Sequence, residues 1–166
     1  MPQVERVVWD TNVVIGLLEQ KPERFPLIAP FVEDAEAGRL EIVVANTTVV
    51  ELQGLKGLRE RGATAERTRE IIRDFLSLPY VVRRPLHDEL ADLAGEIAHA
   101  HGIKRAADAV AVAIAVQEQI GTVHTFDGTG KKKGLIGLSG KVGTPPVTIE
   151  VPNHGDGTLF AERNDG

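Results

Sequence analysis

Four acidic side chains occupy positions where chemistry collects in proteins that alternate strands and helices. They are Asp10, Glu51, Asp108 and Asp127. Asp10 comes directly after an apolar strand predicted at 4–9, and Asp127 comes directly after a strand predicted at 122–126. Because ligands bind just outside the carboxyl ends of parallel strands, we expect both carboxylates at one edge of the sheet. Glu51 and Asp108 lie near the starts of predicted helices that could reach the same edge.

The chemistry that such a cluster supports is metal binding. Asp108 stands in the most hydrophobic predicted helix, at 107–119, and a buried ionised carboxylate is costly unless its charge is compensated. We expect no matching arginine beside the four acids, so a divalent cation is the favoured compensation. Carboxylate oxygens are hard ligands that select Mg²⁺ or Mn²⁺ rather than zinc. The four acids are therefore predicted to bind one or two such ions and to carry catalysis.

Each acid also has a structural explanation that the sequence leaves open. Residues 48–51 form a capping box, which alone would account for Glu51. Asp10 and Asp108 could cap the helices that follow them, because carboxylates complement free amides and the helix dipole there. Asp127 followed by Gly128 is an ordinary turn dipeptide. The metal site is favoured because all four acids fall at comparable places at once.

Strands and helices are predicted to alternate along the chain, which indicates an α/β fold with a mainly parallel sheet. Helices are expected at 11–20, 25–37, 46–61, 64–76, 87–101 and 107–119, and strands at 4–9, 40–45, 80–82 and 122–126. Residues 128–143 hold six glycines and four lysines and are expected to form a mobile loop.

Length and composition indicate one compact domain. The chain has 166 residues, and we expect the domain to span 1–144. Residues 145–166 are expected to form a C-terminal extension, with an edge strand at 147–151 and then a polar tail. The chain has no cysteine, which fits a reducing cytoplasm. Its longest apolar run, 109–116, is far below the roughly 20 residues of a membrane span, so we expect a soluble protein that does not enter a membrane.

The net charge of −5 is unevenly distributed. The four acids fall in the acidic blocks 1–52 and 85–127, whereas basic residues concentrate in 53–84 and in the lysine run after Asp127. Basic residues of this kind could bind RNA phosphates, or they could simply belong to exposed helices. The predicted substrate contacts are Arg59, Arg67, Lys131, Lys132 and Lys133. Aromatic residues make up only 4% of the chain, so base stacking is poorly supplied.

Other kinds of site fit the sequence less well. The segment 128–132 lacks the first glycine and the Ser or Thr of a P-loop. An aspartyl-phosphate phosphatase would need a second acid where Asn12 stands, and no G-x-S-x-G motif of a hydrolase is present. His99 and His101 are two residues apart and would point to different faces of a helix, so they do not form a zinc pair.

The acids and their neighbours together resemble the PIN-domain nucleases. The segments that carry the resemblance are Val8-Trp9-Asp10-Thr11-Asn12, Thr48-Val49-Val50-Glu51-Leu52, Ala107-Asp108-Ala109 and Thr125-Phe126-Asp127. Their order, hydrophobic settings and distances match over about residues 4 to 130. The resemblance implies a small parallel sheet of four or five strands flanked by helices. It also implies that the four acids bind the metal, and that Asn12 and Thr125 orient a carboxylate or a water molecule.

The same resemblance implies a metal-dependent endoribonuclease that uses an activated water and leaves a 3′-hydroxyl and a 5′-phosphate. Short PIN proteins are most often VapC-type toxins, whose antitoxin would lie across a groove formed by the helices at 25–37 and 47–61. The longer chain departs from the usual toxin. A nuclease of RNA processing, or a silent module that binds RNA or protein without cutting it, therefore stays an alternative, as does phosphatase action. A homodimer is expected from the family alone.

Overall fold

The computed structural model describes residues 3–52, 54–130 and 134–155. Its strands are β1 (Glu5–Trp9), β2 (Leu40–Ala45), β3 (Val81–Arg84), β4 (Thr122–His124) and β5 (Thr148–Glu150). Its α-helices are α1 (Thr11–Leu18), α2 (Phe25–Glu36), α3 (Asn46–Leu52), α4 (Lys56–Glu60), α5 (Ala65–Leu76), α6 (Asp88–His101) and α7 (Ala106–Gln117). A 3₁₀ helix, η1, covers Leu135–Leu138. In the described part of the chain, no helix is both long enough and apolar enough to cross a bilayer.

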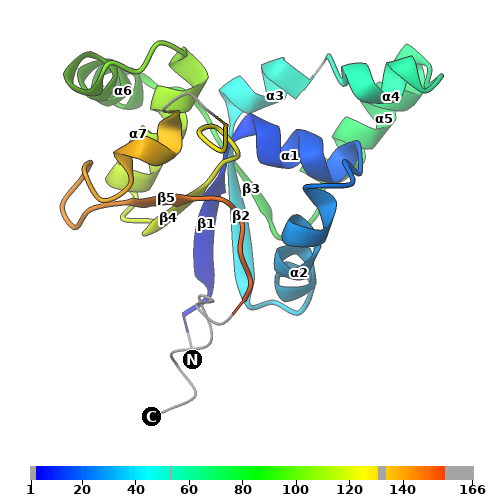
Figure 1. Ribbon diagram of the computed structural model, residues 1–166, viewed down its shortest axis with the longest axis horizontal. Coiled ribbons are helices and arrows are strands. Elements are labelled where there is room, and N and C mark those ends of the chain that lie inside the picture. The colour runs from blue at the N-terminus through cyan, green and yellow to red at the C-terminus, as the bar shows by residue number, and fades with distance from the viewer. Residues whose placement is uncertain (1–2, 53, 131–133, 156–166) are drawn as a thin grey trace.

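The five strands form one parallel sheet in the order β3-β2-β1-β4-β5, which confirms the predicted α/β class. β1 lies in the centre, where Trp9 pairs with His124 of β4. In Figure 1, β1 and β2 run upward from the N-terminal end of the molecule, and α1 and α3 begin near their upper ends. There α6 and α7 stand on one side and α1 to α5 on the other. Residues that follow β1 and β4 are thereby brought to one edge.

Alternate side chains of the strands pack into two separate hydrophobic cores, one on each face of the sheet, as expected for a sheet that is covered on both faces. Val8 and Val43 face α6 and α7, whereas Val7, Trp9 and Ile42 face the helices α1, α2 and α5. The first core explains why α7 is apolar on nearly every side, since Ala109 to Ala115 are all buried. The two cores hold β1 rigidly, and with it the position of the residue that follows.

A buried histidine helps to fix the register of β1 and β4. The indole Nε1 of Trp9 donates to Nδ1 of His124 over 3.2 Å, and the Phe31 ring meets the imidazole edge-on with centroids 4.6 Å apart. Burial lowers the pKa of His124 to about 3, so the ring is neutral and Nδ1 can accept this bond. His124 is therefore part of the core and not a pH-sensitive group near neutrality.

The prediction of a single helix at 46–61 is wrong, because the chain forms two helices there, α3 and α4, with a break between them. Leu55 lies in the break and is buried, which turns the backbone inward. α4 is then attached to the end of α1: the backbone N–H of Leu58 donates to a Glu19 carboxylate oxygen over 3.2 Å. A Cβ on Gly57 would lie 2.6 Å from the Glu19 carboxylate, so a larger residue there would require this carboxylate to move. This contact joins residues far apart in the sequence, so no local sequence pattern predicts the break between α3 and α4.

The segment expected as a mobile loop is packed over much of its described length. η1 lies within it, and Leu135 and Val142 are buried against the core on the α7 side, contrary to the expectation. Apolar residues spaced among the glycines drive this packing. The expected edge strand is confirmed as β5, which pairs with β4. The tail after residue 155 and the domain boundary at 144 remain predictions.

Residues after β5 also contact the helical layer. His154 Nε2 lies 2.6 Å from Oδ2 of the buried Asp34 on α2, and Arg39 donates to Oδ1 of the same carboxylate. Asp34 thus holds both the turn into β2 and the chain beyond β5. This explains why the last described residues run beside α2 in Figure 1.

A candidate metal centre at the carboxyl edge of the sheet

Asp10 is buried at the point where β1 gives way to α1. Its carboxylate Oδ1 accepts from the backbone N–H of Thr11 over 2.9 Å, so it caps α1 as the sequence allowed. Its second oxygen, Oδ2, accepts from the Thr125 hydroxyl over 2.8 Å. Burial raises the pKa of Asp10, while the bonds from Thr125 and Thr11 oppose that shift. Asp10 is therefore both a helix cap and part of a polar cluster.

Asn12 and Thr125 link the ends of β1 and β4. Asn12 Nδ2 donates to Asp10 Oδ2 over 3.3 Å, and its Oδ1 accepts from the backbone N–H of Phe126 over 2.9 Å. The Thr125 hydroxyl, which donates to Asp10, accepts from the backbone N–H of Asp127 over 3.0 Å. These two side chains therefore hold Asp10 and Asp127 in fixed relation, which is the geometry that a supporting role requires.

Glu51 reaches the same edge from α3. Its Oε1 accepts from the Thr11 hydroxyl over 2.6 Å, and Thr11 also lies 3.0 Å from the Thr48 hydroxyl. Because Thr11 has only one hydroxyl proton and gives it to Glu51, Thr48 must donate to Thr11. The other oxygen, Oε2, accepts from Arg105 over 2.8 Å. Glu51 is thus fixed by α1 on one side and by the start of α7 on the other.

Asp108 lies in the first turn of α7 and is almost fully buried. Its pKa is raised to about 6, first by burial and then by the charges of Asp10, Asp127 and Glu51, whereas the charge of Arg105 opposes the shift. Within the described residues, no group donates a hydrogen bond to this carboxylate. The other three acids therefore lie close enough to Asp108 for their charges to favour its protonated form.

Arg105 corrects the expectation that no arginine would lie beside the acids. Its pKa is raised first by the charge of Asp108, and then by the hydrogen bond and charge of Glu51 and by the charge of Asp10. The sequence did carry a signal, since Arg105 precedes Asp108 by three residues and α7 brings such positions together. Thr11 and Thr48 were also missed as partners of Glu51.

The acids suit a divalent ion by chemistry, though not by their present arrangement. Among the described residues, no group of three or more Asp, Glu, His or Cys side chains is positioned so that it could hold a metal ion. One oxygen of Glu51 is taken up by Arg105, and Asp127 Oδ2 accepts from the backbone N–H of Leu135 over 2.9 Å. The Asp108 carboxylate, whose pKa is raised by burial and by the charges of three other acids, would still be stabilised by a cation. The donor set therefore suits Mg²⁺ or Mn²⁺ by its chemistry alone.

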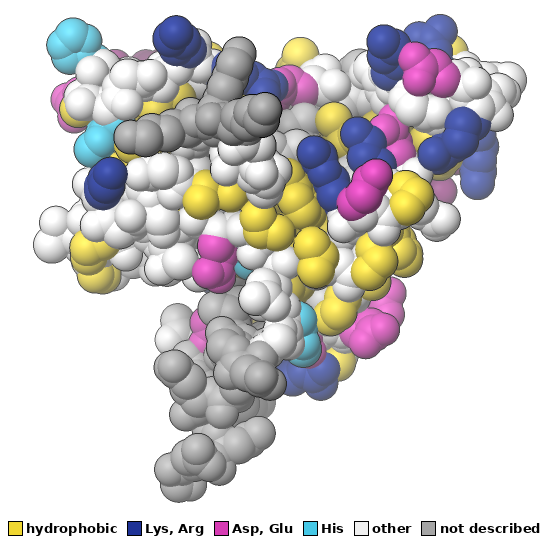
Figure 2. Space-filling model, in the orientation of Figure 1, with side chains coloured by type: hydrophobic (Ala, Val, Ile, Leu, Met, Phe, Trp, Pro, Cys, Tyr) yellow, Lys and Arg dark blue, Asp and Glu magenta, His cyan; other side chains and the backbone are white. Residues whose placement is uncertain are grey.

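The predicted substrate contacts lie partly away from the acids. Arg59 is exposed at the end of α4, and Arg67 on α5 forms an ion pair with Glu70 over 2.7 Å. Basic side chains gather over these two helices at the upper right of Figure 2. The lysines Lys131, Lys132 and Lys133 lie outside the described residues.

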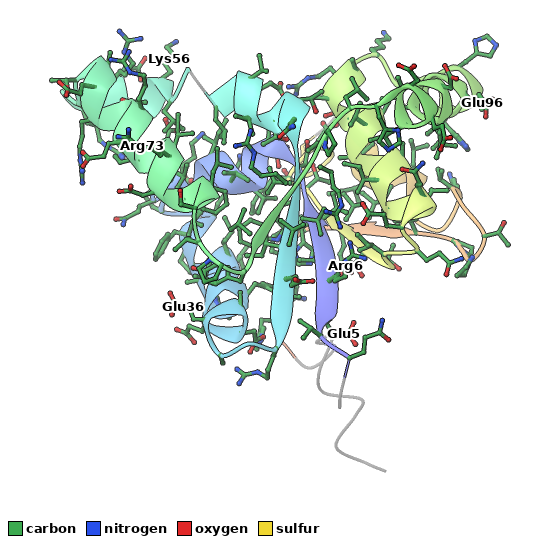
Figure 3. The ribbon with its side chains drawn as sticks, turned by 180° about the vertical axis from the view of Figure 1, so that it is seen from behind. Glu5, Arg6, Glu36, Lys56, Arg73 and Glu96 are labelled. Atoms are coloured by element: carbon green, nitrogen blue, oxygen red, sulfur yellow. The ribbon has the colours of Figure 1, made fainter. Side chains whose placement is uncertain are left out.

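A groove of about 500 Å³ lies on α5 and β3, lined by Arg69, Arg73 and Arg83 among others. Figure 3 shows Arg73 on the α5 side, at the opposite end of the molecule from Glu96 on α6. Arg83 Nε donates to Asn46 at the start of α3 over 3.1 Å, so the groove adjoins the helix that carries Glu51. All three arginines belong to the basic block 53–84, in which the sequence indicated possible phosphate contacts.

The fold and the acidic edge define an α/β protein with a polar site at the end of a parallel sheet. A family model described as the PIN domain matches residues 7–133, more than half of the chain, and the chain therefore belongs to the PIN domain family. No curated protein sequence matches the chain.

Three solved structures share the fold. A chain of VapBC2 from Rickettsia felis, crystallised with a promoter DNA fragment, is 16% identical with a TM-score of 0.59, covering 88% of this chain and 98% of that one. The Mycobacterium tuberculosis toxin VapC20, which cleaves the sarcin–ricin loop, is 18% identical with a TM-score of 0.56, covering 74% and 90%. FitAcB from Neisseria gonorrhoeae is 19% identical with a TM-score of 0.53, covering 88% and 97%.

Proposed function

We propose that this protein is a metal-dependent endoribonuclease whose active site is the edge formed by Asp10, Glu51, Asp108 and Asp127. The observation that carries the proposal is the hydrogen-bond network that links Glu51, Asp10 and Asp127 at the carboxyl edge of the sheet, through Thr11 and Thr125. The charges of these three acids, together with burial, raise the pKa of Asp108 beside them to about 6. If the four acids only capped helices, there would be no reason for them to lie within reach of one another's charges. Ionisable groups with strongly shifted pKa values cluster at functional sites.

Each side chain has a distinct task in the proposed reaction. A bound Mg²⁺ or Mn²⁺ would supply a water of lowered pKa and neutralise charge on the scissile phosphate. Asp10 and Asp108 are the proposed principal ligands, because both are buried and face the same edge. Asn12 and Thr125 keep Asp10 oriented through the bonds to its Oδ2. Glu51 on α3 and Asp127 after β4 are the other two proposed ligands of the ion.

The biological role that we propose is that of a toxin in a toxin–antitoxin pair. The fold shared with VapC20, VapBC2 and FitAcB supports it. An antitoxin segment would find apolar surface in a hollow of about 310 Å³ lined by Leu17, Val32 and Ile71 among others. This hollow involves α1, α2 and α5, so it includes one of the two helices expected to form the groove, α2, but neither α3 nor α4, which cover the other at 47–61. A homodimer remains a prediction from the family.

The test is cleavage of single-stranded RNA by the purified protein with Mn²⁺ or Mg²⁺, set against chelator and against Asp10→Asn and Asp108→Asn. We expect both variants to lose activity by at least about a hundredfold, because each removes a charged ligand. Asp92→Asn, an exposed change on α6, is the matched control and should cleave as the parent does.

Binding measurements separate the proposal from its alternatives. Mn²⁺ should raise the melting temperature of the parent protein and not that of Asp108→Asn, since only a folded site binds the ion. A silent module would bind RNA without cutting it under any of these conditions. A phosphatase would instead hydrolyse a small phosphomonoester such as p-nitrophenyl phosphate and leave RNA intact.

A further inference from the structure

Arg105 occupies a position that the proposed metal site leaves unexplained. Its Nη2 donates to Glu51 Oε2 over 2.8 Å, and it is the cation whose charge opposes the pKa shifts of both Asp10 and Asp108. It stands immediately before α7, at the N-cap position, where its side chain does not cap the helix. Its position is therefore explained by the acids and not by the helix.

The ion pair is built so that it can open. The Arg105 side chain is 61% exposed and that of Glu51 is 30% exposed, so water can replace either partner. Exposed pairs of this kind contribute little net stability. Glu51 would also stay in place without Arg105, because its Oε1 is held by Thr11 and α3 is anchored through buried Leu52. The arginine is thus the mobile member of the pair.

We propose that Arg105 is an internal stand-in for the divalent ion, because its guanidinium neutralises the acids through Glu51 while no ion is bound. When an ion binds, Arg105 is displaced from Glu51 and binds the phosphate of the RNA. This inference rests on the proposed function and deepens it. It explains why four acids that suit a metal ion are not arranged around one point, since one oxygen of Glu51 is already used by a cation. It makes Arg105 a positioning residue for the substrate.

The displaced guanidinium would remain beside the site. Its backbone is fixed by the carbonyl of Arg105, which accepts from the backbone N–H of Asp108 over 3.1 Å. A guanidinium binds phosphate oxygens in a bidentate fork, as it binds a carboxylate. The chain therefore offers an arginine that can exchange one anionic partner for another within the reach of its own side chain.

Isothermal titration of Mn²⁺ into the RNA-free protein tests the exchange without relying on cleavage. Arg105→Ala should bind Mn²⁺ more tightly than the parent, by up to about fivefold, because an exposed ion pair of ordinary strength no longer competes. Lys104→Ala is the matched control: it removes the same charge one residue away, from an exposed side chain, and should change the affinity by less than about twofold. Arg105→Gln is a second variant that keeps most of the side-chain volume and should behave like Arg105→Ala.

RNA binding tests the second half of the exchange. With Ca²⁺ in place of Mg²⁺, and with intact RNA verified on gels, the parent should bind a single-stranded oligonucleotide more tightly than it does with chelator. Arg105→Ala should lose most of this gain while Lys104→Ala keeps it.

The outcomes distinguish this inference from the proposed function. If Arg105→Ala binds Mn²⁺ no more tightly than the parent, or if Lys104→Ala gains as much, the stand-in role is wrong while the metal site stands. If the parent itself binds no Mn²⁺, the proposed function and this inference both fail.

Discussion

At the scale of single residues, the fold holds four acidic side chains close together although their negative charges repel one another. Asp108 has no hydrogen bond from the described residues, and its nearest compensation is the charge of Arg105. Burial and three acids favour its protonated form, so the folded chain binds this proton more tightly than the unfolded chain does. Without metal, ionised Asp108 therefore lowers the stability of the fold.

The sign of this effect gives a prediction for Asp108→Asn. The pKa of Asp108 rises from an ordinary value of 3.8 to about 6 on folding, so parent stability falls as pH rises between these values and stays lowered above them. With chelator present, Asp108→Asn should have a melting temperature near that of the parent at about pH 4 and above it at pH 7.5. Scanning calorimetry at the two pH values measures the difference. Asp92→Asn should show no such divergence, and a gain of equal size at both pH values would refute the account.

The four acids could be picked out from the sequence because Asp10 and Asp127 come shortly after β1 and β4, and Glu51 and Asp108 lie in the first two turns of a helix; these positions are local. Arg105 and the two threonines could not be assigned in the same way. Their roles depend on contacts with Glu51, which lies 54 residues from Arg105 and 40 from Thr11. Spacing along α7 placed Arg105 near Asp108, but nothing local showed that α3 would bring Glu51 to it.

At the scale of elements, local sequence patterns predicted most strands and helices. The predictions that failed concern segments whose structure depends on long-range contacts. The helix α5 was predictable because its caps and its apolar stripe are encoded within it: Thr64 accepts from the backbone N–H of Arg67, and Ile72 and Phe75 are buried. The break before α4 was not, because it depends on Leu55 entering the core and on Glu19 of another element. The loop after Asp127 was misjudged for the same reason, since its few apolar residues pack on α7.

That loop also positions Asp127, which gives a prediction for Gly134→Ala. A Cβ on Gly134 would lie 2.4 Å from Asp127 Oδ1, so the carboxylate must move or the turn must open. Overpacking of this kind typically costs about 1–3 kcal/mol. We expect Gly134→Ala to weaken Mn²⁺ binding and RNA cleavage severalfold although all four acids are kept. Gly130→Ala, in the same loop and with no atom of the described residues within 4 Å of its new Cβ, is the control. Unchanged Mn²⁺ affinity in Gly134→Ala would mean that Asp127 is not a ligand.

At the scale of the whole molecule, charge is separated between the two helical flanks of the sheet. Basic side chains gather on α4 and α5, whereas the acidic side chains Asp88, Glu89, Asp92 and Glu96 lie on α6. The upper ends of β1 and β2 lie between these flanks in Figure 1, and Asp10 directly follows β1. An RNA strand would therefore be attracted to one side of the site and repelled from the other, which orients it although the net charge is negative.

The groove on α5 and β3 is the surface on which this orientation can be measured. Arg67, predicted from the sequence as a contact, is turned to Glu70, whereas Arg69 and Arg73 line the groove next to Arg83. If the strand leaves the site past Asn46 into this groove, each of Arg69→Ala and Arg73→Ala removes about one phosphate contact. The slope of log affinity against log salt should then fall by about 0.7 per substitution, the value for single strands.

Fluorescence anisotropy with a long single-stranded RNA, at several salt concentrations, measures the slope. Lys141→Ala removes the same charge from an exposed residue outside the groove and should leave the slope unchanged. A substrate too short to reach the groove should bind the parent and both arginine variants equally. If the short and long substrates lose the same affinity, the arginines act through the general field of the molecule and the strand does not follow this path.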